Sequence, residues 1–140
     1  MIEIARTRRE SSASPARFFE RWCDLPTHPE WAPSMEYFRL AEPFAVGARG
    51  VLRAVGGEEA AFRVVEVGPG FVYSDATALE GAELIVRHEA VAQGDGVLVE
   101  LSAFVDGPEA ATWAPRLASD LQCSLEHDLA SLAAMLEESA

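Results

Sequence analysis

The sequence predicts an α+β protein in which a curved antiparallel sheet of about seven strands surrounds one long C-terminal helix. From Glu109 to Glu138, apolar side chains recur at helical spacing and form a single stripe. The stripe consists of Trp113, Leu117, Leu121, Leu125, Leu129, Leu132 and Leu136. Between Met35 and Val105, short runs of strand-forming residues alternate with Gly and Pro turns. A sheet that curves around a one-faced helix is expected to leave a cavity between the two.

The chain before residue 35 predicts an edge strand and two short helices. Met1–Arg9 alternates Ile with charged or small residues, as an edge strand does. Ser14 followed by Pro15 is typical of a helix start, because Ser caps the first turn and Pro fits the first helical position. This helix should run to about Asp24, where Pro26 stops it. Thr27–Trp31 should add one short helical turn.

Six strands are expected to follow, joined by hairpin-length turns in an antiparallel meander. They are Met35–Leu40, Arg49–Val55, Ala61–Val67, Phe71–Leu79, Ala82–Ala92 and Val97–Val105. The pattern leaves open which face of the first and third of these strands points inward.

The length, charge and composition of the chain exclude several classes of function. The 140 residues fit one domain, residues 1–140, and the net charge of −12 argues against a nucleic-acid partner. No apolar run approaches the roughly 20 residues of a membrane span. The first residues have no apolar signal-peptide core, so a cytoplasmic location is expected. All 11 basic residues are Arg, which excludes Schiff-base chemistry on a lysine.

His88 is the strongest candidate for chemistry. In its strand the charged Arg87 and Glu89 need water, so His88 should point inward with Leu84 and Val86. An inward imidazole suits proton transfer, and a structural core histidine is the alternative. By the same alternation Phe71 and Tyr73 share a face, and the Tyr73 phenol is the expected hydrogen-bond partner of His88, directly or through water.

Further apolar residues complete the expected ligand site. On the last strand Val99 and Leu101 belong to an apolar inner face, and Leu117 and Leu121 face them from the long helix. The expected catalytic pair is His88 and Tyr73. The expected ligand-binding residues are Val86, Leu84, Phe71, Val99, Leu101, Leu117 and Leu121. Outward-facing Leu98 and Phe104 suggest a homodimer contact.

Metal and cofactor chemistry has no signature in the sequence. His28, between two prolines, and His127, off the apolar stripe, are expected at the surface. Metal-ligand spacing such as HExxH is absent, as are GxGxxG and GxSxG, so neither a metal nor a cofactor is expected.

Several segments in this order resemble the START/Bet v 1-like helix-grip superfamily (SRPBCC). They are Ser14-Pro15, FFERWCDLPTHPEW (18–31), VGARGVL (46–52), FRVVEVGPGFVY (62–73), RHE (87–89) and GDGVLVELSAFVDGP (94–108). More narrowly, the chain resembles small bacterial polyketide cyclase/dehydrase-type proteins. The resemblance implies a hydrophobic small molecule bound between sheet and C-terminal helix, with aldol closure or dehydration as the reaction. A non-catalytic lipid or quinone carrier and a chaperone-activator-type interaction module remain alternatives, so enzymatic activity stays open.

Overall fold

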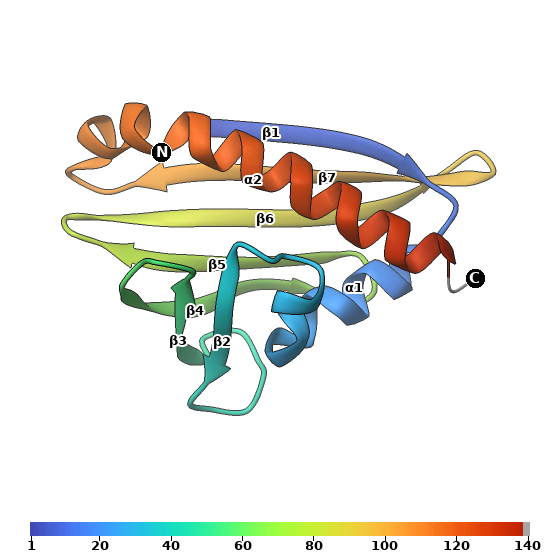
Figure 1. Ribbon diagram of the computed structural model, residues 1–140, viewed down its shortest axis with the longest axis horizontal. Coiled ribbons are helices and arrows are strands. Elements are labelled where there is room, and N and C mark those ends of the chain that lie inside the picture. The colour runs from blue at the N-terminus through green and yellow to red at the C-terminus, as the bar shows by residue number, and fades with distance from the viewer. Residues whose placement is uncertain (139–140) are drawn as a thin grey trace.

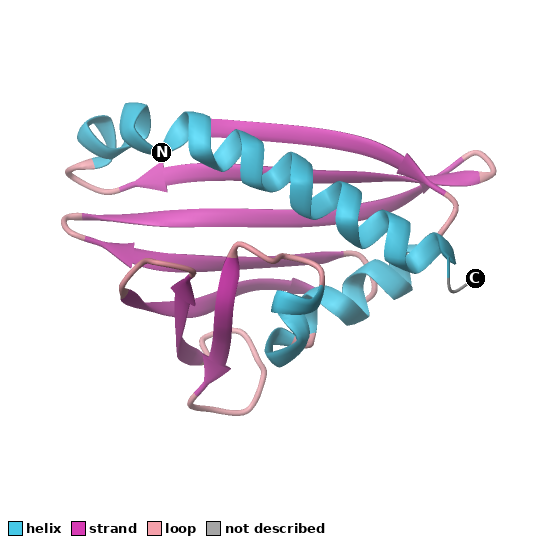
Figure 2. Ribbon diagram, in the orientation of Figure 1, coloured by secondary structure: helices cyan, strands magenta, loops and turns pink. Residues whose placement is uncertain are grey.

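The computed structural model describes residues 1–138 and follows the predicted order of elements (Figure 1). One strand and two short helices precede six strands and a long helix. Figure 2 distinguishes the helices in cyan from the strands in magenta. In chain order the elements are β1 (Ile2–Ser11), α1 (Pro15–Cys23), the 3₁₀ helix η1 (Leu25–Glu30), β2 (Met35–Leu40), β3 (Arg49–Ala54), β4 (Glu59–Gly68), β5 (Val72–Leu79), β6 (Ala82–Gln93), β7 (Gly96–Asp106) and α2 (Ala110–Glu138).

All seven strands form one antiparallel sheet in the order β1-β7-β6-β5-β4-β3-β2. Strands β2 to β7 are sequential neighbours, as hairpin turns require, and β1 pairs with β7 from the other end of the chain. The inner face of β7 is fully apolar as predicted, and Val99, Leu101 and Val105 are buried there. The predicted fold class, an antiparallel sheet with a long C-terminal helix and two short helices after the first strand, is confirmed.

The start of α1 follows the predicted capping chemistry. The Ser14 Oγ accepts a hydrogen bond from the Arg17 backbone N–H at 3.3 Å, and Pro15 occupies the first turn. One turn apart, Phe18 and Trp22 are fully buried on the inner face of this helix. Pro26 lies in η1, so the α-helix ends where the prediction placed it.

Two β-bulges settle the strand faces that alternation left open. The register of β2 against β3 shifts between Met35 and Tyr37, which lets Met35 and Phe38 face the same interior. The register of β4 against β5 shifts between Val64 and Glu66. Val64 is therefore buried, whereas Glu66 pairs with Arg87 on the outer face.

Helix α2 lies diagonally across β1 and β7, and its C-terminal end reaches α1 (Figure 1). The predicted stripe is correct for Leu125, Leu129, Leu132 and Leu136, which are buried. It is wrong for its first members, Trp113, Leu117 and Leu121, which are only partly buried. A row of residues four apart advances about 40° around a helix of 3.6 residues per turn at each step. Trp113 therefore lies about 160° from Leu129, and Ala110 and Ala114 take its place against the sheet.

Phe71 and His28 lie in other environments than the sequence predicted. Phe71 lies in the turn before β5, not on the strand, and is 43% exposed. His28, expected in solvent, is only 5% exposed, because η1 folds over β2 and carries the ring inside. Across residues 1–138, no helix combines the length and the hydropathy needed to cross a membrane.

Candidate functional site

A pocket of about 300 Å³ lies between α2 and the inner faces of β2, β5 and β6. Its wall combines apolar side chains with four ionisable ones. The lining residues are His28, Ser34, Met35, Phe38, Leu52, Ala54, Asp75, Leu84, Val86, His88, Leu121, Ser124, Leu125 and Asp128. Segments far apart in the sequence line this pocket, because β5 and β6 lie inside the sheet, β2 forms one edge, and α2 packs mainly on β1 at the other edge.

The structure brings four of the predicted site residues into the pocket wall: Leu84, Val86 and His88 from β6, and Leu121 from α2. Five others lie outside this wall. Tyr73 is fully buried next to His88, and Val99 and Leu101 are buried in the core beneath α2. Leu117 is one turn before Leu121 and partly buried, and Phe71 is exposed in its turn.

His88 points inward, as the alternation of β6 predicted, and is 4% exposed. Its ring lies between Trp22 and Tyr73, with ring centroids 5.3 and 5.5 Å away. The Nδ1–H donates to the Tyr73 carbonyl oxygen at 3.1 Å, because a carbonyl can only accept. Burial lowers the pKa of His88 to about 4. The neutral ring therefore presents Nε2 as a hydrogen-bond acceptor.

The Tyr73 phenol makes no direct hydrogen bond to His88, so the direct form of that prediction is wrong. Its hydroxyl donates instead to Asp75 Oδ2 at 2.9 Å. Tyr73 and Asp75 are two positions apart on β5, so their side chains lie on the same face of the sheet. Burial and the neighbouring Asp75 raise the pKa of Tyr73, which keeps the phenol protonated as a donor.

Asp75 lines the pocket while being only 4% exposed. Burial raises the pKa of its carboxyl to about 7, although the hydrogen bond from Tyr73 opposes this change. Asp75 is two positions after Tyr73 on the same strand, but the sequence analysis did not select it. The two-residue spacing could have identified it, because an Asp two positions after an inward-pointing Tyr on a strand points to the same face.

His28 forms the opposite end of the pocket wall. Its ring centroid lies 4.0 Å from that of Trp31 and 4.2 Å from that of Phe38, against which it stacks. The buried Nδ1 atom has no hydrogen-bond partner within residues 1–138. Burial, together with His88, lowers the pKa of His28 to about 3. His127, by contrast, is exposed as expected.

Asp128 supplies a second carboxylate, from α2. Its Oδ1 is buried and has no partner in the part of the chain that the structure describes. Burial raises the pKa of this carboxyl to about 6. Asp128 follows Leu121 by seven residues and Leu125 by three, which is the helical spacing that would have placed it on the pocket side. Sequence reasoning treated that face only as an apolar stripe.

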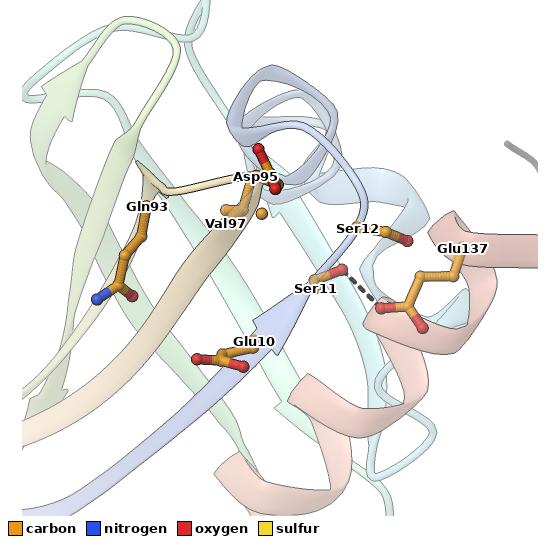
Figure 3. A pocket seen from close by; sticks show the side chains of 8 residues that line it. Glu10, Ser11, Ser12, Gln93, Asp95, Val97 and Glu137 are labelled. Atoms are coloured by element: carbon orange, nitrogen blue, oxygen red, sulfur yellow. Dashed lines mark hydrogen bonds between the residues drawn. The ribbon is translucent and has the colours of Figure 1, made fainter.

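A second, larger hollow lies at the far end of β1, next to the β6–β7 turn (Figure 3). Its lining is mainly polar and contains none of the predicted site residues. The Ser11 hydroxyl donates to Glu137 Oε2 at 2.6 Å, which fastens the end of α2 to β1 (Figure 3). Over residues 1–138, no three His, Cys, Asp or Glu side chains gather as a metal ion would require.

Neither a protein-family model nor a curated protein sequence matches this chain. Solved structures do match it over nearly its whole length. The di-domain ARO/CYC protein StfQ from the steffimycin biosynthetic pathway superposes with a TM-score of 0.78 at 10% identity, covering 99% of this chain and 52% of StfQ. Ara h 8.0201 gives 0.75 at 14% identity, covering 94% of this chain and 95% of the other. A START superfamily protein from Mycobacterium smegmatis gives 0.69 at 19% identity, covering 99% of both chains.

These three proteins share one architecture with the chain, an antiparallel sheet closed by a long C-terminal helix. At such low identities the likeness establishes the fold and not the activity. The chain therefore has a helix-grip fold like that of these neighbours.

Proposed function

We propose that this protein binds an apolar small molecule in the pocket between the sheet and α2. The pocket itself carries this proposal, because its apolar wall is interrupted by four ionisable side chains from separate elements. Binding sites for small molecules combine an apolar lining with a few convergent polar groups in this way. A filled interior would instead have favoured a protein-interaction module.

The volume limits the size of the ligand. An apolar cavity of about 150 Å³ accommodates one benzene molecule. A pocket of about 300 Å³ suits a compound of two fused rings or a similar aliphatic body. The fold neighbours support a ligand-binding role, since they include a START superfamily protein and an ARO/CYC protein.

A substitution that fills the pocket with a larger side chain tests this proposal. N-phenyl-1-naphthylamine, whose fluorescence rises in apolar surroundings, should bind the wild-type protein and be displaced by naphthalene. Val86 lines the pocket, so Val86→Trp should weaken binding by at least about tenfold. Val91 lies exposed on the same strand, so Val91→Trp is the matched control and should bind normally. Equal binding by both variants would exclude this pocket as the site.

A second candidate function is proton transfer of the cyclase or dehydrase type. His88 offers a neutral acceptor at Nε2, and Asp75 is a carboxyl whose pKa is raised to about 7, which suits an acid–base group near neutral pH. In this role Tyr73 positions Asp75 through its hydroxyl and does not itself exchange protons.

Hydrogen–deuterium exchange into a bicyclic ketone tests the catalytic candidate. The carbon next to the carbonyl of 2-tetralone should exchange faster with the protein than in buffer, and NMR would follow the loss of signal. His88→Ala and Asp75→Asn should both return the rate to background, whereas Val91→Trp should not. An unchanged rate in both pocket variants would leave binding as the function and remove proton transfer.

A further inference from the structure

The polar part of the pocket consists mainly of acceptors and carries no basic side chain other than histidine. Asp75 and Asp128 face the pocket from the sheet and from α2, and the tautomer of His88 leaves Nε2 as a third acceptor. The lining contains no Arg, and the sequence contains no Lys. The only hydroxyl donors in the wall are Ser34 and Ser124.

Two polar atoms of this wall have no hydrogen-bond partner within residues 1–138. Asp75, by contrast, accepts a hydrogen bond at Oδ2 from Tyr73. Asp128 Oδ1 is buried and unpaired. His28, which is 95% buried and lines the same pocket, also leaves Nδ1 without a partner. Because buried polar groups are normally paired, two unpaired groups around one pocket indicate a missing hydrogen-bonding partner.

We propose that the ligand of this pocket carries a protonated amine on an apolar body, with the ammonium held by Asp75 from β5 and Asp128 from α2. The inference rests on the proposed binding function and adds the chemical class of the ligand to it.

An ammonium group fits this wall better than an anionic or a neutral polar group does. It offers up to three donors and no acceptor, so it matches carboxylate oxygens and an imidazole lone pair. Its charge offsets the desolvation of two carboxylates that have no other countercharge in the wall. An anionic ligand would be repelled by both carboxylates, and a neutral ligand would bring no positive charge to them. The net charge of −12 also attracts cations to the protein.

Three naphthalene derivatives of nearly equal size test the proposal by calorimetric titration at a pH near 8. 1-Naphthylmethylamine is a cation, 1-naphthalenemethanol is its neutral counterpart, and 1-naphthoic acid is an anion. The amine should bind at least about tenfold more tightly than the alcohol, and the acid should bind most weakly. Equal affinity for amine and alcohol would overturn the inference while leaving the binding function intact. Absence of binding by all three would overturn both.

Substitutions of Asp75 and Asp128 test whether these two carboxylates cause the preference for the amine over the alcohol. Asp75→Asn and Asp128→Asn keep the side-chain shape and should each bring amine affinity close to that of the alcohol, with alcohol binding unchanged. Asp120 is exposed on the same helix, so Asp120→Asn is the control and should retain the full preference. A preference that survives in the Asp75→Asn/Asp128→Asn double variant would place the amine elsewhere and overturn the proposal.

The preference for the amine over the alcohol should also depend on pH. Lowering the pH through about 7 and about 6 protonates Asp75 and Asp128 and should reduce amine affinity, because the carboxylates lose their charge. The other titratable groups near them are Tyr73, His28, His88 and, beside Asp128 on α2, His127, which acts to lower the pKa of Asp128. Tyr73 remains a neutral phenol, and His28 and His88 become charged only near pH 3 to 4. Amine affinity that rises on acidification would contradict the assignment.

Discussion

Replacing Asp75 with Asn should make the protein more stable at neutral and alkaline pH. The Asp75 carboxyl is buried, and its pKa rises from an ordinary value of 3.8 to about 7. Each unit of pKa shift is equivalent to about 1.4 kcal/mol. The shift of Asp75 therefore lowers the unfolding free energy at high pH by at most about 4 kcal/mol. Asn keeps the shape, and its amide oxygen can still accept the hydrogen bond from Tyr73.

The sign follows from proton linkage. Because the pKa of Asp75 is higher in the folded state, unfolding releases a proton between about pH 4 and pH 7. The wild-type protein therefore loses stability as the pH rises through that window, and Asn at this position does not. His28 and His88 have lowered pKa values and act in the opposite direction, but they are present in both proteins and cancel in the difference.

Urea denaturation followed by tryptophan fluorescence measures the effect at several pH values. We expect Asp75→Asn to exceed the wild type by about 2–4 kcal/mol near pH 8 and to match it near pH 4. The exposed Asp120→Asn should show no such trend. A difference that does not change with pH, or a less stable Asn variant near pH 8, would refute the argument that burial destabilises the charged Asp75 carboxylate. A stabilising substitution at a binding residue is the expected result where function keeps a strained group in place.

The other predictions concern packing and local structure. Leu129→Ala should lower the unfolding free energy by about 2–5 kcal/mol, because Leu129 is buried beneath α2. Leu121→Ala should lower it by less than Leu129→Ala, because Leu121 borders a pocket that is already open; equal losses by urea denaturation would contradict this geometry. Ser14→Ala should lower it by about 1 kcal/mol through loss of the α1 cap, whereas Ser14→Gly should change it by only a few tenths. His88→Ala should lower it by about 1–3 kcal/mol, since a packed ring and its hydrogen bond to Tyr73 are removed; an unchanged midpoint would show that the ring is dispensable for packing.

The orientation of His88 was predictable because it depends on a local rule. Alternation along β6 places Arg87 and Glu89 outward, and the inward position of His88 follows without knowledge of any other element. The cap at Ser14, the strand boundaries at turns and the antiparallel meander are equally local. These features determined the fold class and four of the pocket residues.

The chemistry of the pocket depended on long-range placement. Asp75 and Asp128 are 53 positions apart and meet only because α2 returns across the sheet. His28 is buried because η1 folds over β2, and no periodicity marks a six-residue 3₁₀ turn. Bulges decide which faces of β2 and β4 point inward, and a bulge is set by pairing with the neighbouring strand. The sequence by itself determined the elements and their order, because hydrophobic period and turn chemistry act within a few residues. Only the tertiary structure decided which polar side chains share one pocket, because their desolvation and hydrogen bonding depend on partners distant in the chain.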